Sequence, residues 1–389
     1  TEYFVNFNVT TVEKEPLIPI GHEIACDQFR LPIESPKKAF KTSGPKLTVS
    51  TNGDNLSASS SKVNFVFNRK TGIVTSYKVD GTEYFSEGFG IQPNFWRAPT
   101  DNDYGNGMPK RLQVWKESSK NFNVTDATVT MDGNNAVVNV NYLLPAGNLY
   151  IVNYTIYPSG AVNVAARFTS TDMDAAQTEV SEATRTATFT PGRDAARKEA
   201  SKLNVPRIGV RFRLPASMNQ VEYFGRGPAE NYLDRNAGSM VGLYKSTAEE
   251  LYFPYVRPQE NGHHTDTRWV SLSTGKKGLL IQADNTIGFN ALRNSIEDFD
   301  DEEATGLSRQ WSNFTPEQVA NHDEAAAKNV LRRQHHINNI TPRDFVEVCV
   351  DLKQQGVAGY DSWGSRPEPA YTLPANREYN WGFTLIPLK

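Results

Sequence analysis

Apolar and polar residues alternate along most of the chain in short runs that turn residues separate. In VNFVFN at Val63–Asn68, every second residue from Val63 onward is valine or phenylalanine. A period of two residues is the pattern of a strand with one buried face. Similar runs predict strands at Tyr3–Thr11, Lys46–Ser50, Ile73–Val79, Ala136–Leu143, Leu149–Pro158, Ala161–Thr169, Ile208–Leu214, Gln220–Gly225, Gly278–Ala283, Phe345–Leu352 and Asn380–Pro387. Many short strands with few helical segments between them predict an all-β fold, built as a large antiparallel β-sandwich.

Turn and helix signals agree with this fold class. Pairs of turn residues separate the runs at Asp80–Gly81, Asp132–Gly133 and Ser159–Gly160, and such pairs favour hairpins between antiparallel strands. Helical patterns are few and short, and the candidates are Met108–Ser118, Asp194–Lys202, Ala248–Tyr252 and Pro316–His322. We expect these helices in the connections between strands.

One linker is visible near the start of the chain. The segment Leu31–Gly44 (LPIESPKKAFKTSG) holds two prolines and three lysines among small polar residues, which is a composition typical of linkers. Residues 1–31 are too few to bury a core of their own, and they already alternate like a strand. We therefore predict the end of a preceding domain at 1–31, a linker at 32–45 and a large β-sandwich at 46–389, with a cut N-terminus.

Charge and composition argue against several classes of partner. The formal net charge is −3, which favours neither nucleic acid nor an anionic membrane surface. No apolar run approaches the roughly 20 residues that span a bilayer. The two cysteines, Cys26 and Cys349, have no metal-binding spacing, and the acidic run Glu297–Glu303 lacks the glycine placement of a calcium loop. We expect no metal site in this chain.

The segment with the densest chemistry is FWRAPTDND at Phe95–Asp103. It gathers four charged or amide side chains around a proline turn: Arg97, Asp101, Asn102 and Asp103. As a structural element, it would be a corner whose polar side chains cap nearby backbone amides. As a functional element, it would be a pocket rim that binds sugar hydroxyl groups, or the anchor of a hinged loop through Gly105. The residues alone leave both interpretations open.

A second segment, GYDSWG at Gly359–Gly364, holds Asp361 and Trp363 between glycines. An indole ring is well suited to cover the C–H face of a pyranose. A contact that hides about 50 Å² of apolar surface contributes on the order of 1 kcal/mol. The alternative is a tryptophan packed in a crevice at a sheet edge. Both segments are typical of a sugar pocket, but neither supplies the pair of acids that glycoside hydrolysis requires.

Five sequence blocks, taken in their order and spacing, resemble one enzyme family. They are GHEIACDQF at Gly21–Phe29, FWRAPTDND, GRGPAENYLDR at Gly225–Arg235, PYVRPQENG at Pro254–Gly262 and GYDSWG. As a set they resemble the C-terminal part of a glycoside hydrolase family 2 β-galactosidase of the large bacterial type, in the region of its small-chain β-sandwich. The resemblance covers almost the whole chain.

The resemblance implies an architecture and a site. In that family an immunoglobulin-like domain follows the catalytic (β/α)₈ barrel, so residues 1–31 would be the last strands of that domain. The large sandwich after it would have a galactose mutarotase-like fold, or supersandwich. Trp363 would stack on galactose, and Asp103 and Gly105 would begin the family's mobile substrate loop. The rest of the pocket rim would be formed by Arg97, Asp101, Asn102 and Asp361.

The resemblance also implies the chemistry of the parent enzyme. Terminal β-galactosides are hydrolysed with retention by two carboxylates about 5–5.5 Å apart, which lie at the C-terminal face of the barrel. Magnesium, with sodium as a second ion, would belong to that barrel too. We therefore expect no catalytic residue and no cofactor in this chain. Its partners would be a galactoside and the preceding barrel domain, in a homo-oligomeric parent of the bacterial cytoplasm or periplasm.

Two other functions stay open. A free-standing aldose 1-epimerase would need a histidine acid and a glutamate base in one cleft, and the candidates are His263, His264, His335 or His336 with Glu260 or Glu378. A carbohydrate-binding module without catalysis would need only aromatic stacking. Glu230 and Glu260 lie in blocks that match the family, but at no catalytic position of it.

Overall fold

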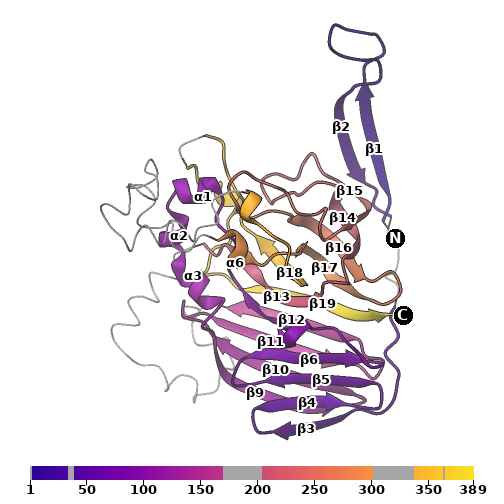
Figure 1. Ribbon diagram of the computed structural model, residues 1–389, viewed down its shortest axis with the longest axis vertical. Helices are drawn as coiled ribbons and strands as arrows, with labels where there is room; N and C mark the ends of the chain where they lie inside the picture. Colours follow the sequence, from indigo (N-terminus) through magenta and orange to yellow (C-terminus); the bar gives the residue numbers. More distant parts are fainter. Residues whose placement is uncertain (1, 34–38, 170–203, 301–336, 362–363) are drawn as a thin grey trace.

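The computed structural model describes residues 2–33, 39–169, 204–300, 337–361 and 364–389. Three sheets of two, five and twelve strands make up the described fold (Figure 1). All pairings between the named strands of these ranges are antiparallel. The predicted all-β fold of large antiparallel sheets is therefore confirmed.

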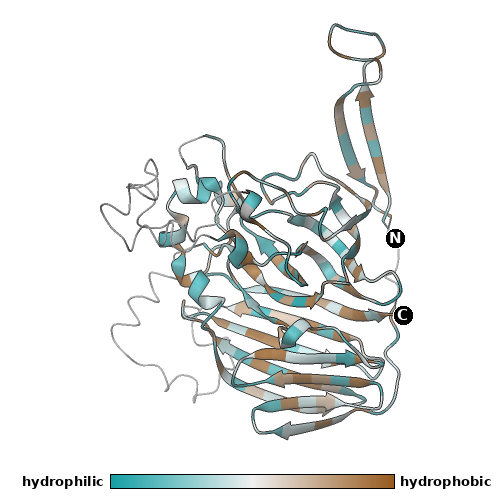
Figure 2. Cartoon of the chain, viewed as in Figure 1, coloured by the Kyte–Doolittle hydropathy of each residue, from teal (hydrophilic) through white to brown (hydrophobic). Residues whose placement is uncertain are grey.

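The two-stranded sheet is a ribbon that projects from the rest of the molecule (Figure 1). It consists of β1 (Phe4–Thr10) and β2 (Glu23–Arg30). Apolar side chains such as Phe7, Val9 and Ile24 are more than half exposed on it. Figure 2 shows brown, hydrophobic bands along both strands. The ribbon thus has no apolar core of its own among the described residues. Its assignment to a preceding immunoglobulin-like domain stays a prediction.

The five-stranded sheet follows chain order. Its strands are β3 (Thr48–Asn52), β4 (Asn55–Ser59), β5 (Val63–Asn68), β6 (Ile73–Val79) and β7 (Thr82–Glu83). In β5 the residues alternate between buried and partly buried along its whole length, as the period of two predicts. The predicted bounds of β5 and β6 match the structure.

The twelve-stranded sheet has a main path in the order β15-β14-β16-β17-β19-β12-β11-β10-β9, from which β18, β13 and β8 branch. The strands are β8 (Gln92–Asn94), β9 (Asn123–Asp132), β10 (Asn135–Leu143), β11 (Leu149–Ile156), β12 (Val162–Thr169), β13 (Arg207–Pro215), β14 (Gln220–Gly227), β15 (Met240–Thr247), β16 (His264–Ser273), β17 (Gly278–Leu292), β18 (Phe345–Gln354) and β19 (Tyr379–Leu388).

The long strand β17 is the branch point of this sheet. Its first part, Gly278–Ala283, pairs with β19, and its second part, Gly288–Leu292, pairs with β18. The sequence predicted only the first part. Residues 284–286 are polar and exposed, so they interrupt the apolar alternation on which the prediction depended.

Aromatic side chains fill the space between the two larger sheets. Phe65 of β5 packs on Tyr154 of β11, with ring centroids 5.6 Å apart. The buried hydroxyl of Tyr77 donates to the backbone oxygen of Gly160 at 2.6 Å, and that of Tyr142 donates to Gly72 at 2.9 Å. Tyr77 and Tyr142 come from opposite sheets, and each phenol finds a partner in a turn between two strands of the facing sheet, as a buried hydroxyl requires.

Helices in the described ranges are short and lie in connections. They are α1 (Asp101–Gly105), α2 (Met108–Arg111), α3 (Gln113–Ser118), α6 (Ile296–Phe299) and the 3₁₀ turns η1 (Ser86–Gly88), η2 (Ile337–Asn339) and η3 (Pro369–Tyr371). The helix predicted at Met108–Ser118 is confirmed as the consecutive helices α2 and α3.

The helix predicted at Ala248–Tyr252 is wrong. This segment is a turn in which the Leu251 amide donates to the Thr247 oxygen at 3.0 Å. Pro254 follows closely, and a proline disfavours helical backbone at the residue before it. The single turn therefore cannot extend into a helix. The helices predicted at Asp194–Lys202 and Pro316–His322 lie outside the described residues.

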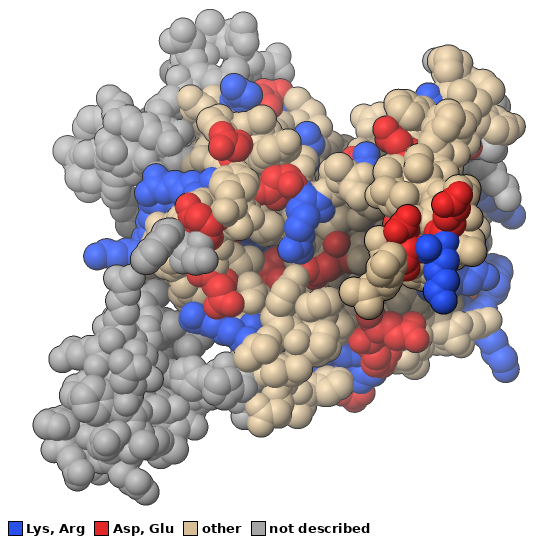
Figure 3. All heavy atoms as spheres, turned by 90° about the horizontal axis from the view of Figure 1, so that it is seen from above, with Lys and Arg blue, Asp and Glu red and all other residues tan. Residues whose placement is uncertain are grey.

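One face of the molecule shows charges of both signs. Figure 3 looks down on the end from which the ribbon projects, and acidic and basic side chains are interspersed over its described part. No helix in the described ranges has the length and apolar character to cross a membrane.

Candidate functional site

Neighbouring strands of the large sheet bring polar residues together at one edge. The register sets Arg207 of β13 opposite Gln354 of β18, and it sets Gly209 beside both Asn94 of β8 and Asp351 of β18. A Cβ atom on Gly209 would lie 2.1 Å from Oδ1 of Asp351, so the glycine leaves the space that this carboxyl group occupies. The segments that follow β8 and β18 in sequence start from this edge.

Arg97 and Asp103 form a buried ion pair just after β8. Arg97 donates from Nε to Oδ2 of Asp103 at 3.1 Å and from Nη2 to Oδ1 at 3.0 Å. Their side chains are 0% and 2% exposed. Asp103 also forms a capping box with Thr100 that begins α1. The carboxylate expected to contact substrate therefore faces Arg97 rather than solvent, and Arg97 lies beneath the surface rather than at a rim.

The guanidinium of Arg97 also holds the segment after β18. Its Nη1 donates to the side-chain oxygen of Gln354 at 3.2 Å and to the backbone oxygen of Gln355 at 2.6 Å. Its Nη2 donates to the backbone oxygen of Gly356 at 3.1 Å. A planar guanidinium with five donors suits such a fork of acceptors. Arg97 thus joins two segments that lie more than 250 residues apart in the sequence.

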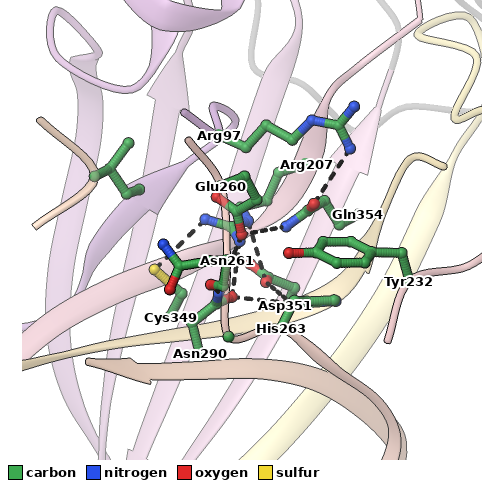
Figure 4. Close-up of polar contacts among 12 residues, drawn as sticks. Arg97, Arg207, Tyr232, Glu260, Asn261, His263, Asn290, Cys349, Asp351 and Gln354 are labelled. Atoms are coloured by element: carbon green, nitrogen blue, oxygen red, sulfur yellow. Dashed lines mark hydrogen bonds and ion pairs between the residues drawn. The ribbon is translucent and has the colours of Figure 1, made fainter. Parts of the chain in front are cut away.

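Glu260 is the centre of a second buried cluster (Figure 4). Its Oε1 accepts hydrogen bonds from Arg207 Nη2 at 2.9 Å, Asn290 Nδ2 at 3.0 Å and Gln354 Nε2 at 3.0 Å. Since Gln354 also accepts from Arg97, the two clusters form one network. This network joins β13, β17 and β18 to the loop that carries Glu260.

Asp351 and His263 complete the network, and both are buried. Oδ2 of Asp351 lies 3.2 Å from Arg207 Nε and 3.9 Å from His263 Nδ1. Burial raises the pKa of Asp351 to about 7, although the charge of Arg207 opposes this. Burial and then the Arg207 charge hold the pKa of His263 well below its ordinary range. Burial would also lower the pKa of Arg207, but Asp351 and Glu260 together raise it, so this arginine stays charged.

The loop after β18 packs directly on α1. Asn102 Nδ2 donates to the backbone oxygen of Val357 at 3.1 Å and to that of Ser365 at 2.5 Å. A Cβ atom on Gly364 would lie 2.4 Å from the carbonyl carbon of Gly105. The two segments that the sequence singled out, Phe95–Asp103 and Gly359–Gly364, are therefore neighbours in space.

The block PYVRPQENG reaches the same place. The Asp101 amide donates to Gln259 Oε1 at 3.1 Å, and Gln259 Nε2 donates to Asp101 Oδ2 at 3.2 Å. The guanidinium of Arg257 lies 3.8 Å from the ring centre of Tyr104 and pairs with Asp101 at 3.5 Å. Three of the five family-like blocks thus meet around α1.

Some of the predicted site residues are exposed, and others are buried beneath them. The exposed residues beside the contact between α1 and the loop after β18 are Asp101, Gly105 and Asp361. Asn102 is partly buried, and Arg97 and Asp103 are buried beneath it. Trp363 lies outside the described residues. The structure brings the described members together, but it orients two of them inward.

Sequence reasoning missed the buried network. Arg207, Asp351 and Gln354 were not singled out, although a signal exists for the first two. Arg207 begins RIGVRF and Asp351 follows VCV, so each charge lies in an apolar strand pattern. A charge buried in a strand must be paired, which would have predicted a partner for each.

The network leaves little room for chemistry of its own. A cavity of about 20 Å³ adjoins it, which is enough for about one water molecule and far too small for a hexose. Glu260 and His263 both contact Asn290, so the acid and the base of the epimerase alternative do converge. They are nevertheless 4% and 1% exposed, and Oε1 of Glu260 is already held by three donors. The described residues also include no group of three or more side chains suited to holding a metal ion.

The matching family and two related proteins are described as β-galactosidases or parts of them. Residues 59–385 match the family described as the β-galactosidase small chain. A β-galactosidase of Priestia megaterium is 31% identical over 371 residues, which are 95% of this chain and 30% of that protein. A β-galactosidase small subunit of Latilactobacillus sakei is 27% identical over 338 residues, which are 82% of this chain and 92% of that protein.

Among solved structures, a galactose 1-epimerase from Lactobacillus acidophilus NCFM superposes with a TM-score of 0.44 and 7% identity, covering 88% of this chain and 98% of that one. At that score the likeness supports no functional conclusion. The family match covers most of the sequence, whereas the chain spans less than a third of the length of the first β-galactosidase relative. This chain belongs to the β-galactosidase small chain family.

Proposed function

We propose that this chain is the small-chain part of a glycoside hydrolase family 2 β-galactosidase and that it completes the galactose end of the active site without supplying catalytic residues. The observation that carries this proposal is the family match over residues 59–385. It is supported by the small-subunit relative, 92% of whose length aligns with this chain. A unit that occurs as a subunit of its own needs a partner for the rest of the enzyme.

The geometry around α1 supports a role in substrate binding. The exposed positions Asp101, Gly105 and Asp361 lie where α1 meets the loop after β18. Beneath them, Arg97 binds Asp103 and the backbone oxygen of Gln355 at the start of that loop. Carboxylate and backbone groups of this kind suit the hydroxyl groups of a sugar. Acidic and basic side chains are interspersed on the face shown in Figure 3, which suits a neutral ligand better than a polyanion. Trp363 would add a stacking face in the same loop.

The remaining chemistry belongs to the parent. Retaining hydrolysis requires a nucleophilic carboxylate and an acid (base) carboxylate, and the proposal assigns both to the catalytic barrel that precedes this chain or forms its partner. The same barrel would hold magnesium, with sodium as a second ion. The parent would be a homo-oligomer. The chain's own contribution would be the surface around α1 and the loop after β18.

The first test is the hydrolysis of a nitrophenyl β-galactoside by this chain alone, with magnesium present and a no-protein control. We expect no turnover. Turnover that Glu260→Gln or another carboxylate substitution in this chain abolishes would overturn the proposal.

The second test uses the full-length β-galactosidase. Trp363→Ala should raise the KM and the inhibition constant of galactose about 5- to 10-fold, because a stacking contact contributes on the order of 1 kcal/mol. Tyr360→Ala is the matched control, since Tyr360 is a 58% exposed aromatic residue of the same loop. An unchanged KM for Trp363→Ala would contradict the proposed role.

A further inference from the structure

The backbone of the loop after β18 adopts a conformation that it would not hold by itself. Ala358 has a φ of +54°, and a non-glycine residue in this left-handed region costs about 1–2 kcal/mol. Such a conformation persists only where its surroundings hold it. The contacts of this loop should therefore include a group that fixes Ala358.

That group is the carboxylate of Asp234. Its Oδ1 accepts the amide hydrogen of Val357 at 2.9 Å, and its Oδ2 accepts that of Ala358 at 2.7 Å. Hydrogen bonds from amides to an ionised carboxylate are stronger than those between neutral groups. Gly356 allows this approach, because a Cβ atom there would lie 2.4 Å from Oδ2 of Asp234.

Asp234 is itself held by the block GRGPAENYLDR. Tyr232 and Arg235 exchange backbone hydrogen bonds of 3.2 and 2.8 Å across a tight turn, which places Asp234 between them. Tyr232 is buried and stacks on His263 with ring centroids 5.6 Å apart. The position of Asp234 is thus tied to the buried network around Glu260.

The neighbouring residues Glu230 and Asn231 fix the same block from its other end. The Gly262 amide donates to Glu230 Oε2 at 2.7 Å. Asn231 is fully buried, and its Oδ1 accepts from the Thr265 amide at 3.0 Å and from the Thr265 hydroxyl at 2.6 Å. The whole block is therefore a rigid support, and Asp234 is the side chain that it directs at the loop after β18.

We propose that Asp234 is a positioning residue of the galactoside pocket: by binding the amides of Val357 and Ala358 it fixes the loop that presents Asp361 beside α1. This inference rests on the proposed function. Asp234 acts together with Arg97 and Asn102, which bind the carbonyl oxygens at 355–357. Asp234 comes from the block GRGPAENYLDR, and Arg97 and Asn102 come from the segment Phe95–Asp103, so two separate segments hold the loop.

The test is Asp234→Asn in the full-length β-galactosidase. The carboxamide keeps the shape of the side chain but turns an NH₂ group toward one of the two amides, so one hydrogen bond becomes a contact between two donors. The loop would then occupy its binding conformation only part of the time, which weakens apparent affinity in proportion. We expect the KM and the galactose inhibition constant to rise about 10-fold, with kcat within about twofold of the wild type.

Asp266→Asn is the matched control. Asp266 belongs to the same region and loses an ion pair to Arg226 of 2.6 Å on substitution, but none of its hydrogen bonds or ion pairs in the described structure reaches the loop after β18. Its KM should stay within about twofold of the wild type. If Asp234→Asn does not yield folded enzyme, Asp234→Ser carries the same test, because it keeps one acceptor and adds no misplaced NH₂ group.

A double substitution separates positioning from general destabilisation. If Asp234 acts through the loop, Asp234→Asn should add little to the effect of Trp363→Ala, whereas independent effects would multiply. A KM for Asp234→Asn equal to that of the Asp266→Asn control, or multiplying effects in the double variant, would overturn the inference. If Trp363→Ala alone has no effect, the proposed function is wrong, and the inference that rests on it is wrong as well. If only Asp234→Asn has no effect, the inference alone fails.

Discussion

Gly364 packs on Gly105 so closely that a Cβ atom on Gly364 would lie 2.4 Å from the carbonyl carbon of Gly105. Real Cβ atoms do not approach backbone that closely, and backbone on both sides cannot give way as a flexible side chain can. The contact joins α1 to the end of the segment Gly359–Gly364. It therefore offers a way to separate them by a single methyl group.

Gly364→Ala in the full-length enzyme should push the loop away from α1 and raise KM for a nitrophenyl β-galactoside. Gly359→Ala is the control, because Gly359 has a φ of +94°, close to the +89° of Gly364, and no atom within 4 Å of the added methyl group. Both variants thus carry a similar backbone strain of about 1–2 kcal/mol. We expect KM to be about 10-fold higher for Gly364→Ala than for Gly359→Ala. Equal values would show that the contact does not matter for binding.

The ion pair between Arg97 and Asp103 should matter for stability because it is buried. Arg97→Met leaves the Asp103 carboxylate without its charged partner and the Gln355 oxygen without its donor. Breaking a buried pair in this way costs about 3–5 kcal/mol, which urea unfolding of the chain would measure. Arg69→Met is the control, since the pair of Arg69 with Asp54 is about half exposed and should contribute less than about 1 kcal/mol. A cost for Arg97→Met as small as that of Arg69→Met would contradict the buried network.

Asp351 should give the stability of the chain a recognisable pH dependence. Its pKa is raised from 3.8 to about 7 in the folded state, so between these values the folded chain binds a proton that the unfolded chain has released. The contribution of this carboxyl group to the free energy of unfolding is fully present below pH 4 and is lost as the pH rises through about 7. The slope is at most about 1.4 kcal/mol per pH unit. His263 acts in the opposite direction, because its lowered pKa removes stability as the pH falls below about 6.5.

Asp351→Asn separates the effect of the Asp351 carboxyl group on the pH dependence of stability from the effect of His263. We expect the free energy of unfolding of the wild type, minus that of Asp351→Asn, to decrease between pH 4.5 and 7.5. The same substitution at the exposed Asp132 controls for the loss of a charge. Parallel pH profiles for the wild type and Asp351→Asn would mean that the Asp351 carboxyl group does not change protonation in this window.

The strands with a clear local alternation were predictable from sequence, whereas β2, β4, β9, β15 and β16 were not predicted. The bounds predicted for Val63–Asn68 and Ile73–Val79 match β5 and β6, where apolar periodicity and turn residues agree. No helix was predicted at α1, since five residues are too few to show a helical period. Its start at Thr100 and Asp103 nevertheless carries a capping-box pattern, which would have predicted it.

The site was less predictable because its contacts join distant segments. Arg97 was assigned to a pocket rim, but it binds the backbone oxygens of Gln355 and Gly356, and only the register of β8, β13 and β18 brings these residues together. Asp234 lies in GRGPAENYLDR, a block that the sequence singled out only for its resemblance to the family. Nothing near Asp234 in sequence indicates that its partners are the amides of Val357 and Ala358. Burial and pairing of polar groups depend on the assembled sheet, which local pattern does not encode.

The side chain of Gln28 should hold the ribbon to the sandwich. Its amide pairs with the backbone of Val241 at the edge strand β15, accepting from the Val241 amide at 2.8 Å and donating to the Val241 oxygen at 2.9 Å. The side-chain amide thus makes the hydrogen bonds that a neighbouring strand would make. It satisfies the amide and the oxygen of Val241, which would otherwise be open for pairing at the edge of the sheet. Gln28→Glu keeps the acceptor but replaces the donor by a carboxylate oxygen, which faces the Val241 oxygen and repels it.

The measurement for Gln28→Glu is hydrogen exchange at the Val241 amide. We expect exchange at least about 10-fold faster than in the wild type, because loss of roughly 1.4 kcal/mol of protection corresponds to a tenfold change. Asn6→Ala is the control: it removes the 2.9 Å bond between Gln28 Nε2 and Asn6 Oδ1 but leaves both bonds to Val241. Unchanged protection of Val241 in Gln28→Glu would mean that the ribbon is held at its base by other contacts. The pair of Arg268 with Glu2, which joins the start of the chain to β16, would then be the next candidate, because it anchors the same end of the ribbon.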